Sequence, residues 1–177
     1  IIHIEKGSWV IDQKSWKYMH WFSDALQRIE LISHKIEEYP VLLTNNYFNF
    51  HYIKSSLDIL DIPYIEIDRE KTYKIKSLLI TSHVAPAGNY DVNITKSLSK
   101  KFKKSISQNK SEDVKKRYWI SRQNASMRKI VNFSEIKSLI EEFNFEIINL
   151  EDYSLVNQIK MLNNSEVIAG LQGAGLT

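Results

Sequence analysis

The most regular alternation of apolar and polar positions lies in the last third of the chain. Three short apolar runs, at residues 117–121, 145–149 and 166–170, are separated by amphipathic segments at residues 134–143 and 154–162. Short apolar runs predict buried strands, and segments with a period near 3.6 residues predict helices. Strand and helix therefore alternate as βαβαβ, which is typical of half of a doubly wound nucleotide-binding sheet.

The first half of the chain shows the same alternation less regularly. Apolar residues recur at steps of three and four between Ser15 and Tyr39, which predicts an amphipathic helix that ends before Pro40. Two short strands are predicted before this helix, and a strand, a helix and two more strands are predicted after it. These elements lie at residues 2–4, 9–11, 41–44, 49–60, 63–67 and 75–81. The pattern again indicates parallel βαβ structure.

Residues 83–91 break the periodic pattern and contain Pro86 and Gly88. Both residue types interrupt regular structure, so we interpret this segment as a linker between two lobes. The predicted fold class is therefore α/β, with two Rossmann-like lobes at residues 1–85 and 86–177.

A helix with one strongly basic face is predicted directly after this linker. Its apolar residues recur every four positions: Ile94, Leu98, Phe102 and Ile106. The opposite face carries Lys96, Lys100, Lys101, Lys103 and Lys104. A solvated helix face accounts for these lysines, and peripheral contact with an acidic membrane surface or an anionic polymer is the alternative.

Composition narrows the class of protein. With 43% hydrophobic and 25% charged residues among 177, the chain has the balance of an ordinary globular protein. Its net charge of +3 is well below that of a dedicated nucleic-acid-binding protein, and it suits a small anionic ligand. No apolar stretch approaches the ~20 residues of a membrane-spanning helix. The chain has no cysteine, which rules out disulfides and favours a reducing compartment, so we expect a cytoplasmic location.

Two arginines flank the loop that follows the strand predicted at residues 117–121. Arg122 comes directly after that strand, and Arg128 lies at the far end of the loop. Arginine presents a planar fork of N–H donors that suits phosphate, and ligands of open α/β sheets collect beyond the carboxyl ends of strands. Arg122 and Arg128 are therefore candidates for binding a nucleotide diphosphate, with a solvated basic loop as the alternative.

A run of small residues follows the last predicted strand and includes Gln172, Gly173, Ala174 and Gly175. Small residues at a strand end let backbone amides approach a phosphate or a ribose closely. A tight turn between a strand and a helix would have the same composition. These four residues are therefore candidates for the same anion site, with a plain turn as the alternative.

His20 and Asp24 are four residues apart and share one side of the first predicted helix. A histidine and a carboxylate held together can act as a general base that takes a proton from a hydroxyl group. A water-exposed helix surface is the alternative interpretation of this spacing. No metal site is expected, because the five histidines are scattered and no Asp-x-Asp sequence follows a strand.

Seven stretches occur along the chain in an order that is more specific than any one of them. They are Tyr18-Met19-His20-Trp21 with Asp24, Gly88-Asn89-Tyr90, Trp119-Ile120-Ser121-Arg122, Arg128-Lys129-Ile130-Val131-Asn132, Phe145-Glu146-Ile147-Ile148, Glu151-Asp152-Tyr153-Ser154 with Gln158, and Val167-Ile168-Ala169-Gly170-Leu171-Gln172-Gly173-Ala174-Gly175-Leu176. In this order they resemble glycosyltransferase family 61 over nearly the whole chain.

This resemblance implies a two-lobed fold of the GT-B type and sugar transfer with inversion at the anomeric carbon, without a metal ion or a cofactor. The second lobe would hold a nucleotide-sugar co-substrate. Members include bacterial capsular polysaccharide enzymes, plant xylan-modifying transferases and animal transferases that place N-acetylglucosamine on proteins. We therefore expect a glycan or another hydroxyl acceptor, with His20 and Asp24 catalytic and with Arg122, Arg128 and residues 172–175 on the donor.

The sequence departs from the family pattern at two places. The family usually has a histidine before Gly-Ala-Gly, whereas this chain has Gln172, which forms hydrogen bonds but does not change charge near neutral pH. The chain also stops at Thr177, inside the glycine-rich loop, so we expect an incomplete second lobe. Both departures favour the alternative of a non-catalytic nucleotide-sugar- or carbohydrate-binding relative. Only the lysine-rich helix suggests nucleic-acid binding, which we do not expect.

Overall fold

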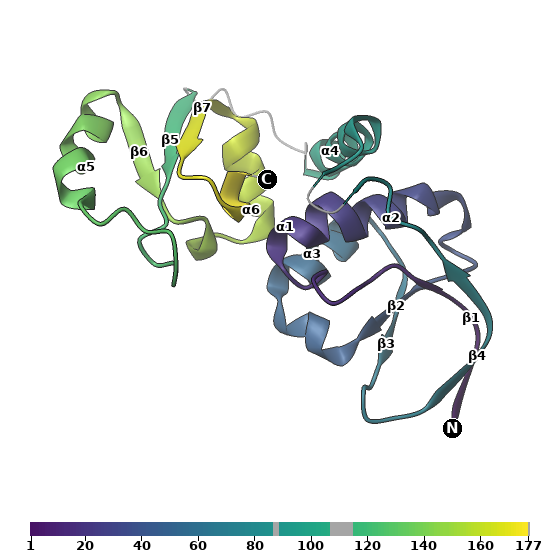
Figure 1. The fold of residues 1–177 in the computed structure, drawn as a ribbon. Coiled ribbons are helices and arrows are strands. Elements are labelled where there is room, and N and C mark those ends of the chain that lie inside the picture. Colours follow the sequence, from purple (N-terminus) through teal and green to yellow (C-terminus); the bar gives the residue numbers. More distant parts are fainter. Residues whose placement is uncertain (87–88, 107–114, 177) are drawn as a thin grey trace. The chain divides into compact units, whose positions relative to one another are not determined.

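The computed structural model describes residues 1–86, 89–106 and 115–176. The chain divides into two compact units, Ile1–Ser105 and Ile106–Thr177, and each unit contains its own parallel β-sheet (Figure 1). The predicted α/β class is therefore confirmed. The GT-B arrangement and a lobe boundary between residues 85 and 86 stay predictions.

The first unit contains a four-stranded sheet in the order β3-β2-β1-β4, with every neighbouring pair parallel. Its strands are β1 Ile2–Trp9, β2 Val41–Thr44, β3 Tyr64–Ile67 and β4 Tyr73–Ile80. Val41, Leu42 and Leu43 of β2 are completely buried. This burial explains why the strand appears in the sequence as an uninterrupted apolar run, and it confirms the prediction for residues 41–44.

Strand β1 corrects the prediction of two short strands at residues 2–4 and 9–11. It runs without a break through Lys6 and Gly7, and it pairs with β4 along its whole length. A Cβ atom at position 7 would lie 2.6 Å from Cδ2 of Leu42, so the glycine leaves room for this side chain of β2. The break in the apolar pattern at Gly7 therefore marks close packing and not the end of a strand.

The helix predicted at residues 15–39 consists of several shorter pieces. They are α1 Tyr18–His20, a π-helical turn at Trp21–Ala25, α2 Leu26–Leu31 and a 3₁₀ turn at Ser33–Lys35. The hydroxyl of Ser23 donates to the carbonyl of Met19 at 2.6 Å, and such side-chain bonds to the preceding turn bend helices. A single regular helix was therefore wrong, although the buried stripe of Leu26 and Ile29 lies as predicted.

The remaining helices of the first unit are a 3₁₀ turn at Asn45–Asn49, α3 His51–Ile59 and α4 Val92–Ile106. The lysine-rich α4 packs on the π-helical turn and on α2: the ring of Phe102 lies 6.2 Å from that of Phe22 in the turn, and Lys101 donates to Glu30 of α2 at 2.6 Å. The compact unit therefore extends through this helix. Most of the predicted linker lies within the unit, and its residues 87–88 are outside the described part of the chain.

The second unit has a three-stranded parallel sheet in the order β6-β5-β7. Its elements are β5 Lys116–Ile120, α5 Phe133–Glu142, β6 Phe145–Ile148, α6 Leu155–Asn163 and β7 Ser165–Gly170, with 3₁₀ turns at Leu150–Asp152 and Ala174–Leu176. Tyr118, Ile120, Ile148 and Leu150 form its buried core. The predicted βαβαβ order is confirmed. The hydroxyl of Ser154 accepts a hydrogen bond from the Asn157 amide and caps α6.

Both sheets contain a point at which the strand order reverses. In the first unit the chain moves outward from β1 to β2 and β3 and then returns to place β4 on the other side of β1. In the second unit β6 and β7 flank β5 in the same way. Ligands of open parallel sheets bind beyond the carboxyl ends of the strands at such a reversal. The residues that follow β1 and β4, and those that follow β5 and β7, are therefore where ligands are expected.

Among the described residues, no helix combines the length and the apolar character needed to cross a lipid bilayer.

Candidate active site

The carboxyl ends of β1 and β4 bring together two polar residues that are distant in the sequence. The register pairs Trp9 of β1 with Ile80 of β4. Asp12 and His83 each lie three residues beyond these partners, so both leave the sheet at the same edge. The π-helical turn contributes Asp24 to the same place. Wide helical turns of this kind are frequent at functional sites.

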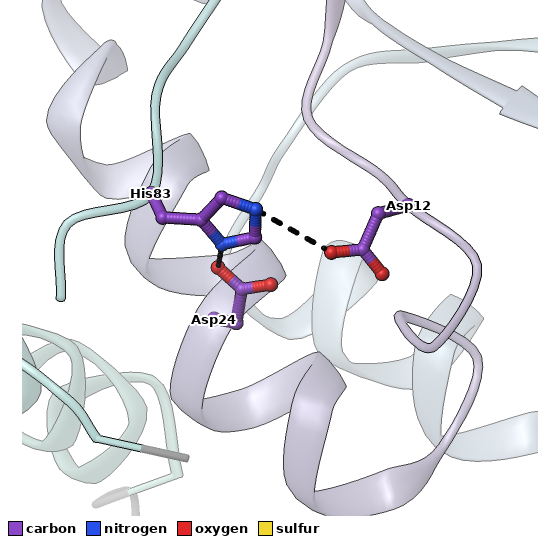
Figure 2. Close-up of side chains that lie close together, drawn as sticks. All are labelled: Asp12, Asp24 and His83. Atoms are coloured by element: carbon purple, nitrogen blue, oxygen red, sulfur yellow. Dashed lines mark hydrogen bonds and ion pairs between the residues drawn. The ribbon is translucent and has the colours of Figure 1, made fainter. Parts of the chain in front are cut away.

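Figure 2 shows the imidazole of His83 between the carboxylates of Asp12 and Asp24. His83 Nδ1 lies 3.0 Å from Asp24 Oδ1, a hydrogen-bonding distance. His83 Nε2 lies 3.6 Å from Asp12 Oδ2, which is too long for a direct hydrogen bond but close enough for an ion pair when the ring is protonated. The Asp24 side chain is only 15% exposed, whereas that of His83 is 49% exposed.

Asp12 is held in place by its own turn. Its Oδ1 accepts hydrogen bonds from the Lys14 amide at 2.7 Å and from the Ser15 hydroxyl at 3.2 Å, so Oδ2 remains directed toward His83. Burial by itself would raise the pKa of Asp12, but these hydrogen bonds, together with the charges of His83 and Arg28, outweigh it and lower the pKa. Asp12 is therefore a carboxylate that stays ionised to lower pH than an ordinary aspartate.

The segment that carries His83 is anchored by Arg28 of α2. The Arg28 side chain is buried, and it donates from Nε to the Thr81 hydroxyl at 3.0 Å and from Nη2 to the Thr81 carbonyl at 2.7 Å. A buried guanidinium is costly unless it is hydrogen-bonded, so these two bonds fix the end of β4 against α2. Because His83 follows Thr81 by two residues, the same anchor fixes its position.

A pocket of about 50 Å³ opens beside this cluster. His20 and Asp24, the two catalytic candidates, both line it, so the structure brings the predicted pair into one place. Asp24 has a different imidazole partner, however, because its hydrogen bond is to His83. Asp12 and His83 are residues that the sequence interpretation did not select. The sequence alone gives no signal for this pair, because their equal spacing beyond the strand ends is visible only once the register of β1 and β4 is known.

The same three side chains bear on the prediction that no metal ion is bound. Asp12, Asp24 and His83 offer ligand atoms that all lie within 4.8 Å of one another, a spacing that a divalent cation could bridge after small side-chain rotations. His83 and Asp24 are already joined by a hydrogen bond of 3.0 Å, so these two side chains have a partner without an ion. Metal independence stays a prediction.

In the second unit, Arg122 lies at the reversal between β5 and β7. Its Nη2 donates to the Met127 carbonyl at 3.2 Å, and its Nη1 lies against Gly173, where a Cβ atom would be 2.1 Å away. Its Nε is buried and has no hydrogen-bond partner among the described residues. A buried donor without a partner costs free energy, so a ligand acceptor at this point would be stabilised.

Arg122 also lines a pocket of about 90 Å³ at this edge, together with Ser121, Glu151, Leu171 and Gly175. Leu171 and Gly175 of the glycine-rich segment therefore line the pocket at the carboxyl end of β5, where the anion site is predicted. Part of its composition has a packing reason, because a Cβ atom on Gly175 would lie 3.0 Å from a methyl carbon of Ile120.

The other donor-side candidates are more exposed. Arg128 is on the surface with a φ of 57°, a left-handed conformation that is uncommon for residues with a Cβ atom. Gln172 is also exposed, and the side chain of Ala174 lies outside the described part of the structure. Neither Arg128 nor Gln172 is among the described residues that line the pocket at Arg122.

These features define an α/β protein with a polar site at the topological reversal of each parallel sheet. A family model described as Glycosyltransferase 61 matches residues 18–177. The chain therefore belongs to glycosyltransferase family 61 and is a glycosyltransferase. No curated protein and no solved structure matches the chain.

Proposed function

We propose that the protein transfers a sugar from a nucleotide-sugar donor to a hydroxyl group of a glycan or polysaccharide acceptor. The observation that carries this proposal is the family match, which covers the segments of both sites apart from Asp12. Placement of both polar sites at the carboxyl edges of parallel strands supports it, since nucleotides bind at such edges.

The second unit binds the donor in this proposal. The guanidinium of Arg122 has a buried Nε free to donate to a phosphate oxygen, and amides of residues 173–175 supply further donors. Arg128 and Gln172 are exposed side chains on the segments next to this site and would reach the donor from the surface. Fixed positive charge would then stabilise the departing nucleoside diphosphate without a metal ion.

The first unit supplies the proton acceptor in this proposal. In an inverting transfer the acceptor oxygen forms a bond to the anomeric carbon on the face opposite the leaving group. The bond from that carbon to the phosphate oxygen breaks, its electron pair leaves with the nucleoside diphosphate, and the acceptor proton passes to a base. His20 and Asp24 line the pocket in which this base is expected.

Incubation of the purified protein with a panel of nucleotide sugars, with and without oligosaccharide acceptors, tests the proposal. Release of a nucleoside diphosphate that requires one particular donor and increases with acceptor is the expected result, and it should persist in the presence of a chelator. Donor binding without release would instead identify a non-catalytic relative, the alternative that Gln172 favours.

We further propose that the enzyme works in the cytoplasm at an anionic membrane surface, to which α4 turns its basic face. Leu98 and Phe102 of this helix are buried, whereas Lys96, Lys100 and Lys104 are exposed. Co-sedimentation with vesicles that contain acidic lipid, lost on replacement of Lys96, Lys100 and Lys104 by glutamine and at high salt, is the expected result. Equal sedimentation with neutral vesicles would contradict it.

A further inference from the structure

We propose that His83 is the general base of the transfer reaction and that Asp24 positions it, while the Asp12 carboxylate stabilises the protonated ring. This inference rests on the proposed function and names the groups that would accept the proton within it.

The hydrogen bond at Nδ1 determines which ring nitrogen can act. Asp24 is 15% exposed and its Oδ1 lies 3.0 Å from His83 Nδ1. A carboxylate accepts hydrogen bonds, so Nδ1 carries the proton when the ring is neutral. The lone pair then lies on Nε2. A carboxylate that holds an imidazole in this tautomer is the arrangement by which serine hydrolases prepare a histidine to accept a proton.

The surroundings of Nε2 leave it available to a substrate. The nearest acidic atom, Asp12 Oδ2, lies 3.6 Å away, beyond a direct hydrogen bond. The His83 side chain is 49% exposed and lines the pocket of about 50 Å³. An acceptor hydroxyl that enters this pocket can therefore donate its hydrogen to Nε2.

Asp12 contributes negative charge where positive charge would develop. Its carboxylate is fixed by the Lys14 amide and the Ser15 hydroxyl, and these bonds help to lower its pKa, so it is ionised at neutral pH. Once Nε2 has taken the proton, the imidazolium lies between two carboxylates and both ring N–H groups face oxygen atoms (Figure 2). This charge arrangement stabilises the state that proton transfer produces.

Three other charged or titratable side chains lie near Asp12, Asp24 and His83 and contribute to the electrostatic potential at the site. Lys14 and His20 line the same pocket, and the positive charge of Arg28 helps to lower the pKa of Asp12. Arg28 also anchors Thr81, so it fixes the distance between the β4 end and α2. His20 shares the pocket, but it is His83 that donates a hydrogen bond to Asp24, which is why His83 and not His20 is assigned as the base.

Each bond that forms in this transfer is matched by one that breaks. The acceptor O–H bond breaks and its proton moves to Nε2 of His83, the oxygen forms a bond to the anomeric carbon, and the nucleoside diphosphate leaves with the electron pair. His83 returns its proton to water after the products have left.

The test compares His83→Gln with His20→Gln, a matched change of another histidine in the same pocket. His83→Gln should lower kcat by roughly 10²- to 10⁴-fold with little change in donor KM. Asp24→Asn should lower kcat by at least about 10²-fold, because an asparagine can stabilise the wrong tautomer. His20→Gln should lower kcat less than His83→Gln does, since His20 lines the pocket but accepts no proton in this scheme. His34→Gln, a change of an exposed histidine that lines neither candidate pocket, should stay within about fivefold of the wild type. The decrease in kcat/KM on the acid side should be present in the wild type and absent from the residual activity of His83→Gln.

Unfolding is excluded by requiring that each variant keep the wild-type denaturation midpoint and donor affinity. A His83→Gln enzyme with near wild-type kcat, or a large loss confined to His20→Gln, would overturn the assignment while leaving the proposed function intact. Loss of wild-type turnover on chelation, restored by a divalent ion, would also overturn it, because His83 would then be a metal ligand. A wild-type protein without any turnover would remove both proposals.

Discussion

Replacement of Gly173 by alanine should weaken nucleotide binding by displacing Arg122. A Cβ atom at position 173 would lie 2.1 Å from Nη1 and 2.9 Å from Cζ of Arg122. Non-bonded heavy atoms rest about 3.5 Å apart, so the guanidinium would have to move by roughly 1 Å or more. The obstructing atoms form the end of a flexible side chain, so the guanidinium can shift without disrupting the fold.

The size of the effect follows from the hydrogen bonds at stake. A charge-assisted hydrogen bond between a guanidinium and a phosphate contributes about 1.5–3 kcal/mol. Its loss corresponds to a weakening of roughly 10- to 150-fold. Arg122→Ala should lower the affinity by a comparable amount, and the two substitutions should not add, because both remove the same contact.

Calorimetric titration with UDP and GDP of the wild type, both single variants and the double variant measures this coupling. The double variant should bind like Arg122→Ala alone. Gly7→Ala is the control, because its Cβ atom would lie 2.6 Å from the Leu42 side chain and should lower the stability of the first unit, which does not contain Arg122. Unchanged affinity in Gly173→Ala, or a further full loss when it is added to Arg122→Ala, would refute this account of the donor site.

Three further expectations concern stability. Leu57→Ala should lower the free energy of unfolding by about 2–5 kcal/mol, measured by urea denaturation, because this leucine is completely buried; a loss near zero would contradict the described core. Ser154→Ala should cost about 1 kcal/mol through loss of the α6 cap, and Ser154→Asp should restore most of it in the same assay. Because the folded pKa of Asp12 is lowered from 3.8, its carboxylate stabilises the fold above that pH and loses this contribution as the pH falls through the folded pKa. Asp12→Asn should therefore show a smaller acid-side loss of stability than the wild type, and equal losses would argue against the hydrogen bonds assigned to Asp12.

The regular elements could be predicted where burial alone decides the pattern. Residues 41–44 lie in a central strand of a parallel sheet with Val41, Leu42 and Leu43 completely buried, and this apolar run leaves little choice of structure. The π-helical turn could not be predicted from the apolar pattern, and its residues make contacts that this pattern does not show: Trp21 donates a tertiary hydrogen bond to Ser56, and Ser23 donates to the Met19 carbonyl. An apolar period near 3.6 contains no information about either contact.

The site at Arg122 could be predicted better than the site at His83, because the second depends on contacts between distant segments. Arg122 lies two residues beyond the end of β5, and local sequence is sufficient to select it. His83 and Asp12 meet only because β4 pairs with β1 in one particular register, and a strand register between distant segments is not encoded locally. Asp24 was selected for its spacing from His20, and the structure gives it another partner.

The most direct test of the central claim is a time course of the donor's anomeric proton signal by NMR, recorded with enzyme, nucleotide sugar and acceptor. The account predicts that the signal of the preferred donor decays and that a product signal of opposite anomeric configuration appears, at a rate that falls at least about 10²-fold in His83→Gln. A donor signal that stays constant while the nucleotide sugar is bound would contradict sugar transfer, and a product that keeps the donor's anomeric configuration would contradict inversion through a single base.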